Sequence, residues 1–78
     1  MKIDEVLRWL SDRFSEKGVV ATVHGNSARE DGDWLYLPVH VEMTDAFDKA
    51  TLLQEIENQW EENPLDRHRY LLLIPSAR

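Results

Sequence analysis

The sequence predicts an α+β fold in which two amphipathic helices pack on one face of a three-stranded mixed sheet. Three observations support this prediction. Apolar residues recur at helical spacing in segments 3–16 and 45–62, and they alternate with other residues in segment 33–43. The segments follow one another in the order α-β-β-α-β. Because the chain has 78 residues, we expect one small domain spanning residues 1–78.

The first helix is predicted over residues 3–16. Its apolar residues share one stripe of about 100° and are Ile3, Val6, Leu7, Leu10 and Phe14. Lys17 and Gly18 follow directly, and a cation with a glycine is typical of a helix C-terminus. We therefore expect this helix to bury the face that carries the stripe and to end near Gly18.

Residues 19–24 and 33–43 predict two strands of a β-hairpin, joined by a polar loop over residues 25–32. Pro38 cannot donate a ladder hydrogen bond, and this favours an edge position for the second strand. We therefore expect the first strand at the centre of the sheet.

The second helix is predicted from Thr44 and Asp45, which provide N-caps, to about Glu62, with Asn63 and Pro64 ending it. The predicted stripe comprises Ala46, Ala50, Leu53, Ile56 and Trp60, with Phe47 and Leu52 at its edges. Residues 67–74 predict a third strand, stopped by Pro75. The intervening helix is long enough for a right-handed crossover between parallel strands.

Composition limits the classes of function. The chain has no cysteine, which excludes disulfides and thiolate metal sites and fits a cytoplasmic protein. Neither a signal peptide nor a membrane span is visible. Residues 44–63 contain six acids against Lys49 alone, a net charge of −5 out of −6 for the chain. This balance disfavours binding to nucleic acid or to an anionic membrane.

Two helices can cover only one face of such a sheet, so the other face is expected to be open. Alternation assigns to it Val20, Thr22, His24, Trp34, Tyr36, Pro38, His40 and Glu42. The third strand adds either Arg67, Arg69 and Leu71 or His68, Tyr70 and Leu72, and alternation does not choose between them. Either way the open face is more apolar than a solvated sheet face usually is.

We expect this face to mediate self-association as a homodimer, with Trp34, Tyr36 and Val20 in the contact. A small domain has a small hydrophobic core, so the apolar surface buried by association adds to its stability. Exposed apolar residues without a role are the plain alternative. The other functional alternative is binding of nucleic acid or an anionic ligand, through Trp34, Tyr36, His24, His40, Arg67 and Arg69.

The second helix offers another candidate surface. Its solvent side carries Asp48, Glu55 and Glu62, with Glu61 nearby. Such a charge run is either a solvated face or a site for a basic protein partner.

No catalytic motif or cofactor fingerprint is present. The predicted hairpin register separates His24 from His40 by about four residues, roughly 13 Å at 3.3 Å per residue, so they do not share a metal. His68 is interpreted as a half-exposed strand residue, and Glu57 as a carboxylate at the edge of the apolar stripe. We therefore expect a non-enzymatic protein–protein interaction module without cofactor or metal.

Overall fold

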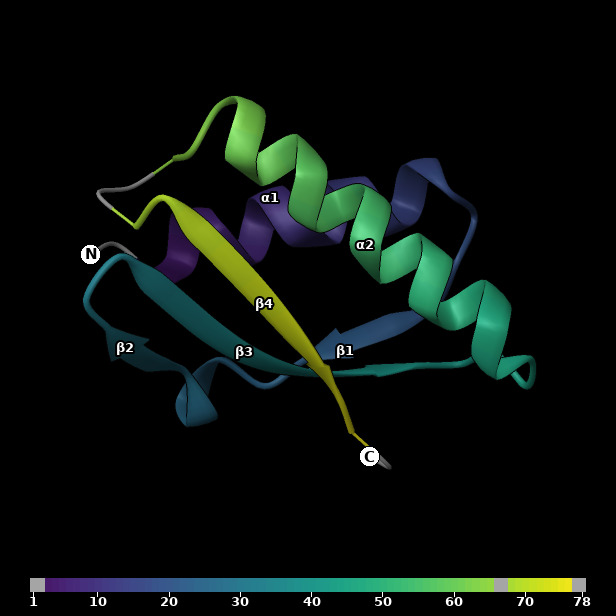
Figure 1. The fold of residues 1–78 in the computed structure, drawn as a ribbon. Helices are drawn as coiled ribbons and strands as arrows, with labels where there is room; N and C mark the ends of the chain where they lie inside the picture. Colours follow the sequence, from purple (N-terminus) through teal and green to yellow (C-terminus); the bar gives the residue numbers. More distant parts are fainter. Residues whose placement is uncertain (1–2, 66–67, 77–78) are drawn as a thin grey trace.

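The computed structural model describes residues 3–65 and 68–76, and it confirms the α+β class. In chain order the elements are α1 (Ile3–Glu16), β1 (Ala21–Val23), the 3-10 helix η1 (Gly25–Ser27), β2 (Arg29–Asp31), β3 (Trp34–Val41), α2 (Ala46–Glu62) and β4 (Tyr70–Pro75). Both helices lie on the same side of the sheet, as predicted (Figure 1).

The sheet differs from the prediction in strand number and order. In the described part of the chain it has four strands, because Arg29–Asp31, predicted as loop, forms β2. β3 pairs antiparallel with β1 and β2, and parallel with β4. β3 is therefore central, and the prediction that the first strand lies at the centre is wrong. The parallel pairing of β3 with β4 across α2 agrees with the predicted crossover.

Pro38 is tolerated in this central strand because the strand pairing on one side of β3 is interrupted there. β1 ends opposite Val39 at Val23, and β2 begins opposite Tyr36 at Arg29. The interruption between β1 and β2, filled by η1, lies opposite Pro38. The Pro38 carbonyl accepts from the His24 N–H at 2.9 Å, so the proline nitrogen faces that same edge. A missing N–H there costs no ladder hydrogen bond.

The turn between β2 and β3 explains why polar residues form a strand. Asp31 lies opposite Trp34, so Gly32 and Asp33 make a two-residue connection. Gly32 has φ of 59°, and no described residue other than glycine has a positive φ. A positive φ at the first central position alone is typical of a type II′ turn. This turn reverses the direction of the chain, so that β2 pairs with β3 in the observed register.

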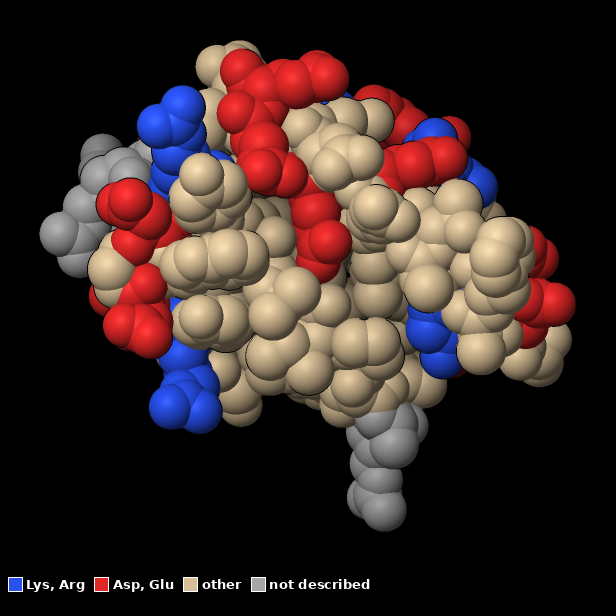
Figure 2. All heavy atoms as spheres, viewed as in Figure 1, with Lys and Arg blue, Asp and Glu red and all other residues tan. Residues whose placement is uncertain are grey.

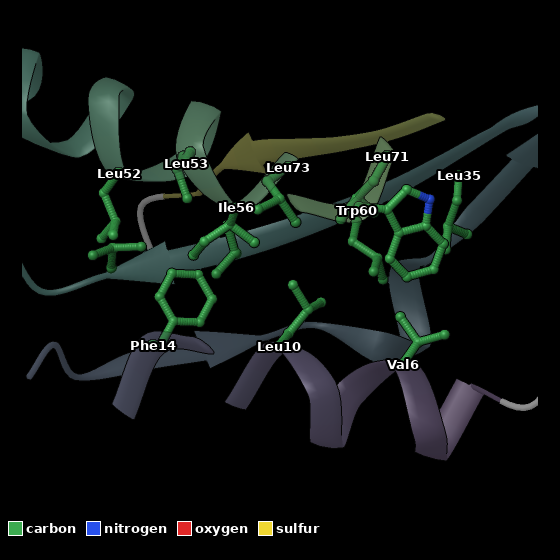
Figure 3. Packing of buried hydrophobic residues seen from close by; sticks show 13 residues of the cluster. Val6, Leu10, Phe14, Leu35, Leu52, Leu53, Ile56, Trp60, Leu71 and Leu73 are labelled. Carbon is green, nitrogen blue, oxygen red and sulfur yellow. The ribbon is translucent and has the colours of Figure 1, made fainter. Parts of the chain in front are cut away.

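The core lies between the helices and the sheet. α1 contributes Val6, Leu10 and Phe14, and α2 contributes Leu52, Leu53, Ile56 and Trp60. The sheet contributes Leu35, Leu37, Val39, Val41, Leu71 and Leu73. Figure 3 shows the α1 side chains pointing towards those of α2 and the sheet.

Each helix begins and ends close to its predicted limits. The Asp45 side chain accepts from the Asp48 N–H at 3.0 Å and caps α2. Burial in α2 starts at Leu52, whereas Ala46, Ala50 and Phe47 are exposed, Phe47 by 78%. The predicted apolar stripe of this helix is therefore wrong at Ala46 and Ala50, which lie outside the core.

Candidate functional site

The face of the sheet away from the helices is the candidate binding surface. Alternation places there Trp34, Tyr36, Pro38 and His40 of β3 together with Tyr70, Leu72 and Ile74 of β4. We call these residues, with the neighbouring side chains of β1 and β2, the open face. The structure thus selects the second predicted alternative for Tyr70 and Leu72, whereas His68 of that alternative is buried. Leu71 is buried in the core, where the first alternative needed it exposed.

Three aromatic rings form a flat stack on the open face. The Trp34 and Tyr36 ring centroids are 6.0 Å apart with planes 11° from parallel. The Trp34 and Tyr70 centroids are 5.0 Å apart at 27°. Rings that lie nearly parallel to one another form one apolar platform. A binding site for an alkylated cation instead needs rings that surround the cation. The stack therefore suits contact with another apolar surface.

Aliphatic side chains extend this platform along β4 and before β1. Trp34, Leu72 and Ile74 are 41%, 38% and 40% exposed, and Val20 is 65% exposed. Neither helix covers them. A contiguous exposed apolar patch is typical of an interaction surface in a small protein.

Two opposite charges lie on the β2 side of the open face. Arg29 is opposite Tyr36, and Asp31 is opposite Trp34. With Glu30, Tyr36 and Ile74 they line a hollow of about 350 Å³. The sequence predicts a loop over this polar stretch, so it indicates neither residue as part of a site. The tight turn at Gly32 was the signal that could have placed them.

The predicted basic and imidazole groups do not gather at the aromatic stack. His24 lines a different hollow with Asp4 and Leu7 of α1, because its backbone leaves the extended conformation before η1. His40 lies opposite Thr22, with Nδ1 3.1 Å from the Ser76 carbonyl oxygen.

The two predicted arginines do not join the stack in the described structure either. Arg69 is exposed and lies before β4, and no contact joins it to the three aromatic rings within the described structure. Arg67 lies outside the described residues. The cation that lies on the open face is therefore Arg29, within the part of the chain that the structure describes.

His68 is fully buried, which corrects the prediction of a half-exposed strand residue. It precedes β4 and so escapes the alternation of that strand. Its Nε2 lies 3.0 Å from Glu30 Oε1, and its carbonyl accepts from Trp60 Nε1–H at 2.9 Å. The pair joins β2 to the start of β4.

The acidic residues of α2 remain on the surface. Asp48, Glu55 and Glu62 are all exposed. Glu55 Oε2 lies 2.9 Å from Lys17 Nζ, at the end of α1. Figure 2 shows acidic side chains gathered along the upper part of the molecule, over α2, and a broad area with little charge below them.

Glu57 has a structural position that the sequence did not indicate. Its Oε2 accepts from the Leu73 N–H at 2.8 Å. Burial raises the pKa of the Glu57 carboxyl, the bond from Leu73 opposes that rise, and the nearby Glu61 charge adds to it. The carboxylate serves the edge of β4 and lies apart from the open face.

The described residues include no group of three or more His, Asp or Glu side chains placed to hold a metal ion. Among them, no helix has both the length and the apolar character needed to cross a bilayer. The chain matches no family model, no curated protein and no solved structure.

Proposed function

We propose that this protein is a non-enzymatic interaction module that self-associates through the open face of its sheet. The observation that carries the proposal is the stack of Trp34, Tyr36 and Tyr70, extended by exposed Leu72 and Ile74 and covered by neither helix. Aromatic residues are enriched in protein interfaces because they bury a large area with little loss of side-chain entropy.

Charge favours a second copy as the occupant. The chain carries a net charge of −6, and two copies repel each other wherever their acidic helices meet. The open face carries few charges, so it is the surface on which two copies approach at least cost. Its Arg29 and Asp31 have opposite signs and lie two residues apart on β2. A two-fold axis can place Arg29 of one copy near Asp31 of the other.

Size favours the same occupant. The two longer extents of the molecule are 32 and 24 Å, so a whole side of it is on the order of 800 Å², and the open face is part of such a side. A standard stable interface takes about this area from each partner. Burying the face also adds apolar contacts that a core of this size lacks.

The test is solution mass by light scattering over a range of protein concentrations. The wild type is expected at twice its 9.2 kDa, and Trp34→Glu and Tyr36→Glu are expected at 9.2 kDa. Phe47→Glu is the matched control, because it removes an aromatic side chain that is 78% exposed but lies on α2. That variant should remain dimeric. A monomeric wild type at millimolar concentration contradicts the proposal, as does a dimer that survives both face variants.

A charge swap tests the two-fold arrangement. Arg29→Glu and Asp31→Arg are each expected to weaken the dimer, because each places like charges together across the axis. The double variant should recover association. If the double variant is the weakest of the three, the two charges do not meet across the interface.

We also propose that the exposed acids of α2, Asp48 and Glu62 with Glu55 beside them, are available to a basic partner. Glu62 is the best position for a test, because a cation at a helix C-terminus is mildly stabilising. Glu62→Lys should therefore slow association with an oligolysine peptide without loss of stability. Equal association rates for wild type and variant contradict this role.

Nucleic-acid binding on the open face is the less favoured alternative. The described cation there is Arg29, and Asp31 beside it opposes a phosphate backbone. Binding that falls steeply with salt and is lost in Arg29→Ala would favour this alternative over self-association.

A further inference from the structure

The outward-facing backbone groups of the two edge strands differ in whether they have hydrogen-bond partners. On β4, the odd-numbered residues direct their backbone groups away from β3, since Tyr70 and Ser76 donate to Asp33 and Val39. That edge is protected, because Glu57 takes the Leu73 N–H and Pro75 has no N–H. Natural sheets protect edges in this way against further strand pairing.

The β1 edge is three residues long and, in the described structure, has neither a proline nor a side-chain acceptor of this kind. Thr22 lies opposite His40, the Val20 carbonyl accepts from Glu42, and the His24 N–H donates to Pro38. The even-numbered residues therefore bond to β3. In an antiparallel ladder the residues between them point their N–H and C=O groups outward. Within the described structure, the outward groups of Ala21 and Val23 face no further strand of the sheet.

A groove runs beside this unprotected edge, with α1 as its other wall. Two hollows of about 420 and 550 Å³ adjoin each other and share Leu7 and Val23. Along α1 the wall is one row of residues spaced by four, which are Ile3, Leu7, Ser11 and Ser15. At 1.5 Å per residue this row is about 18 Å long, which matches about five residues of extended chain.

The lining of the groove indicates which segment fits. Its wall combines aliphatic and small hydroxyl side chains with Phe14, His24 and Asn26, and the carboxylate that lines it, among the described residues, is Asp4. Asp4 lies at the end of the groove where the chain enters η1 at Gly25. An extended segment with alternate apolar side chains and a cation at that end is complementary in shape, hydrogen bonding and charge.

We propose that the β1 edge binds an extended segment of another protein by strand addition, with alternate aliphatic side chains against α1 and a Lys or Arg beside Asp4. The segment runs antiparallel to β1, because antiparallel pairing is the more stable per residue. The basic residue is then at the N-terminal end of the segment. Ala21 and Val23 hydrogen-bond to the segment, and Leu7 and Ser11 contact its side chains. This site lies apart from the aromatic stack of the open face, although Val20 also lines the groove.

The probe is the acetylated, amidated peptide Lys-Thr-Val-Thr-Val. In an antiparallel pair, residues directly opposite one another point to the same face. The two valines therefore lie opposite Ala21 and Val23, with the lysine beyond them near Asp4. We expect amide exchange at Ala21 and Val23, followed by NMR, to slow by at least about tenfold on saturation. The Trp34 indole signal should not move.

Methylation of the peptide backbone distinguishes strand addition from nonspecific apolar binding in the groove. N-methylation of both valines removes the donors that face β1, and it should abolish binding. N-methylation of both threonines removes donors that face solvent, and it should leave binding within about twofold, because those donors make no bond to β1. If the two methylated peptides bind equally, strand addition does not occur.

Protein variants test the wall and the charge. Ser11→Leu fills the groove and should weaken binding at least about tenfold, since it displaces a valine side chain. Asp12→Leu places the same side chain one position away, outside the groove, and should bind as the wild type does. Replacing the peptide lysine by glutamate should weaken binding several-fold in the wild type and have little effect in Asp4→Asn.

Three results overturn the proposal. The first is no change at Ala21 and Val23 with 1 mM peptide. The second is a response confined to Trp34, Leu72 and Ile74, which places the peptide on the open face. The third is protection of Ala21 and Val23 that rises with protein concentration in the absence of peptide, because a second copy then occupies this edge.

Discussion

The carboxylate of Glu57 on α2 lies 2.8 Å from the backbone nitrogen of Leu73 on β4. A side chain of the covering helix thus completes the outer edge of the sheet. A free edge strand otherwise exposes unpaired backbone groups. The same contact holds a partly buried charge next to Glu61, so it carries both a stabilising hydrogen bond and an electrostatic cost.

Glu57→Ala should lower the free energy of unfolding by about 1 kcal/mol or somewhat more, because the Leu73 N–H loses its acceptor. Glu57→Gln retains a carbonyl acceptor and should cost less. Urea titration of the two variants at pH 7 measures the difference. If alanine and glutamine are equally stable, the hydrogen bond contributes nothing measurable to folding.

The raised pKa of Glu57 predicts a pH dependence with a defined sign. The folded protein binds this proton more tightly than the unfolded chain. As pH rises from the ordinary pKa of a glutamate through the raised pKa of Glu57, the contribution of this group to stability therefore falls. The free energy of unfolding of Glu57→Gln, relative to wild type, should increase from pH 5 to pH 7. Glu62→Gln, an exposed neighbour, is the control and should show a smaller change.

Gly32→Ala should destabilise the fold by about 1–2 kcal/mol, because the residue has φ of 59° and a side chain is strained there. Asp33→Ala, in the same turn and with a negative φ, should change stability by less than about 0.5 kcal/mol. Thermal unfolding of the two variants measures both values. An equal loss in each would mean that the turn does not depend on the glycine conformation.

Trp60→Phe should cost about 2–4 kcal/mol. The side chain is fully buried, its ring meets Trp9 edge-on at 5.6 Å, and its Nε1–H donates to the His68 carbonyl. Phenylalanine removes the donor and leaves a cavity. Trp9→Phe, at a half-buried position, should cost less. Denaturant unfolding compares the two, and a larger loss at Trp9 contradicts this account.

The ion pair between Lys17 and Glu55 should contribute less than about 1 kcal/mol, because both side chains are largely exposed, by 41% and 50%. A double-mutant cycle with Lys17→Met and Glu55→Gln measures the coupling. The coupling should disappear at high salt. A coupling that persists there would indicate that the pair is better shielded than its exposure implies.

The sequence by itself determined the elements that depend on local periodicity. The stripe of Val6, Leu10 and Phe14 predicted α1 with its limits, and the alternation from Trp34 to Val41 predicted which face of β3 is buried. The counting of layers predicted an open aromatic face with Trp34 and Tyr36. These features follow from contacts within one element, so a single stretch of sequence contains the information.

Tertiary structure alone decided the order of the strands and the set of residues that completes the open face. Alternation states which side a residue faces, but not which edge receives the next strand, so the sequence predicts an edge position for Pro38. Leu71, Leu72, Leu73 and Ile74 are all apolar, and only their register against β3 separates the buried from the exposed. His68 is buried beside Glu30, which is 38 positions away in the sequence. Pairings between distant segments fixed all three results, and no local pattern encodes them.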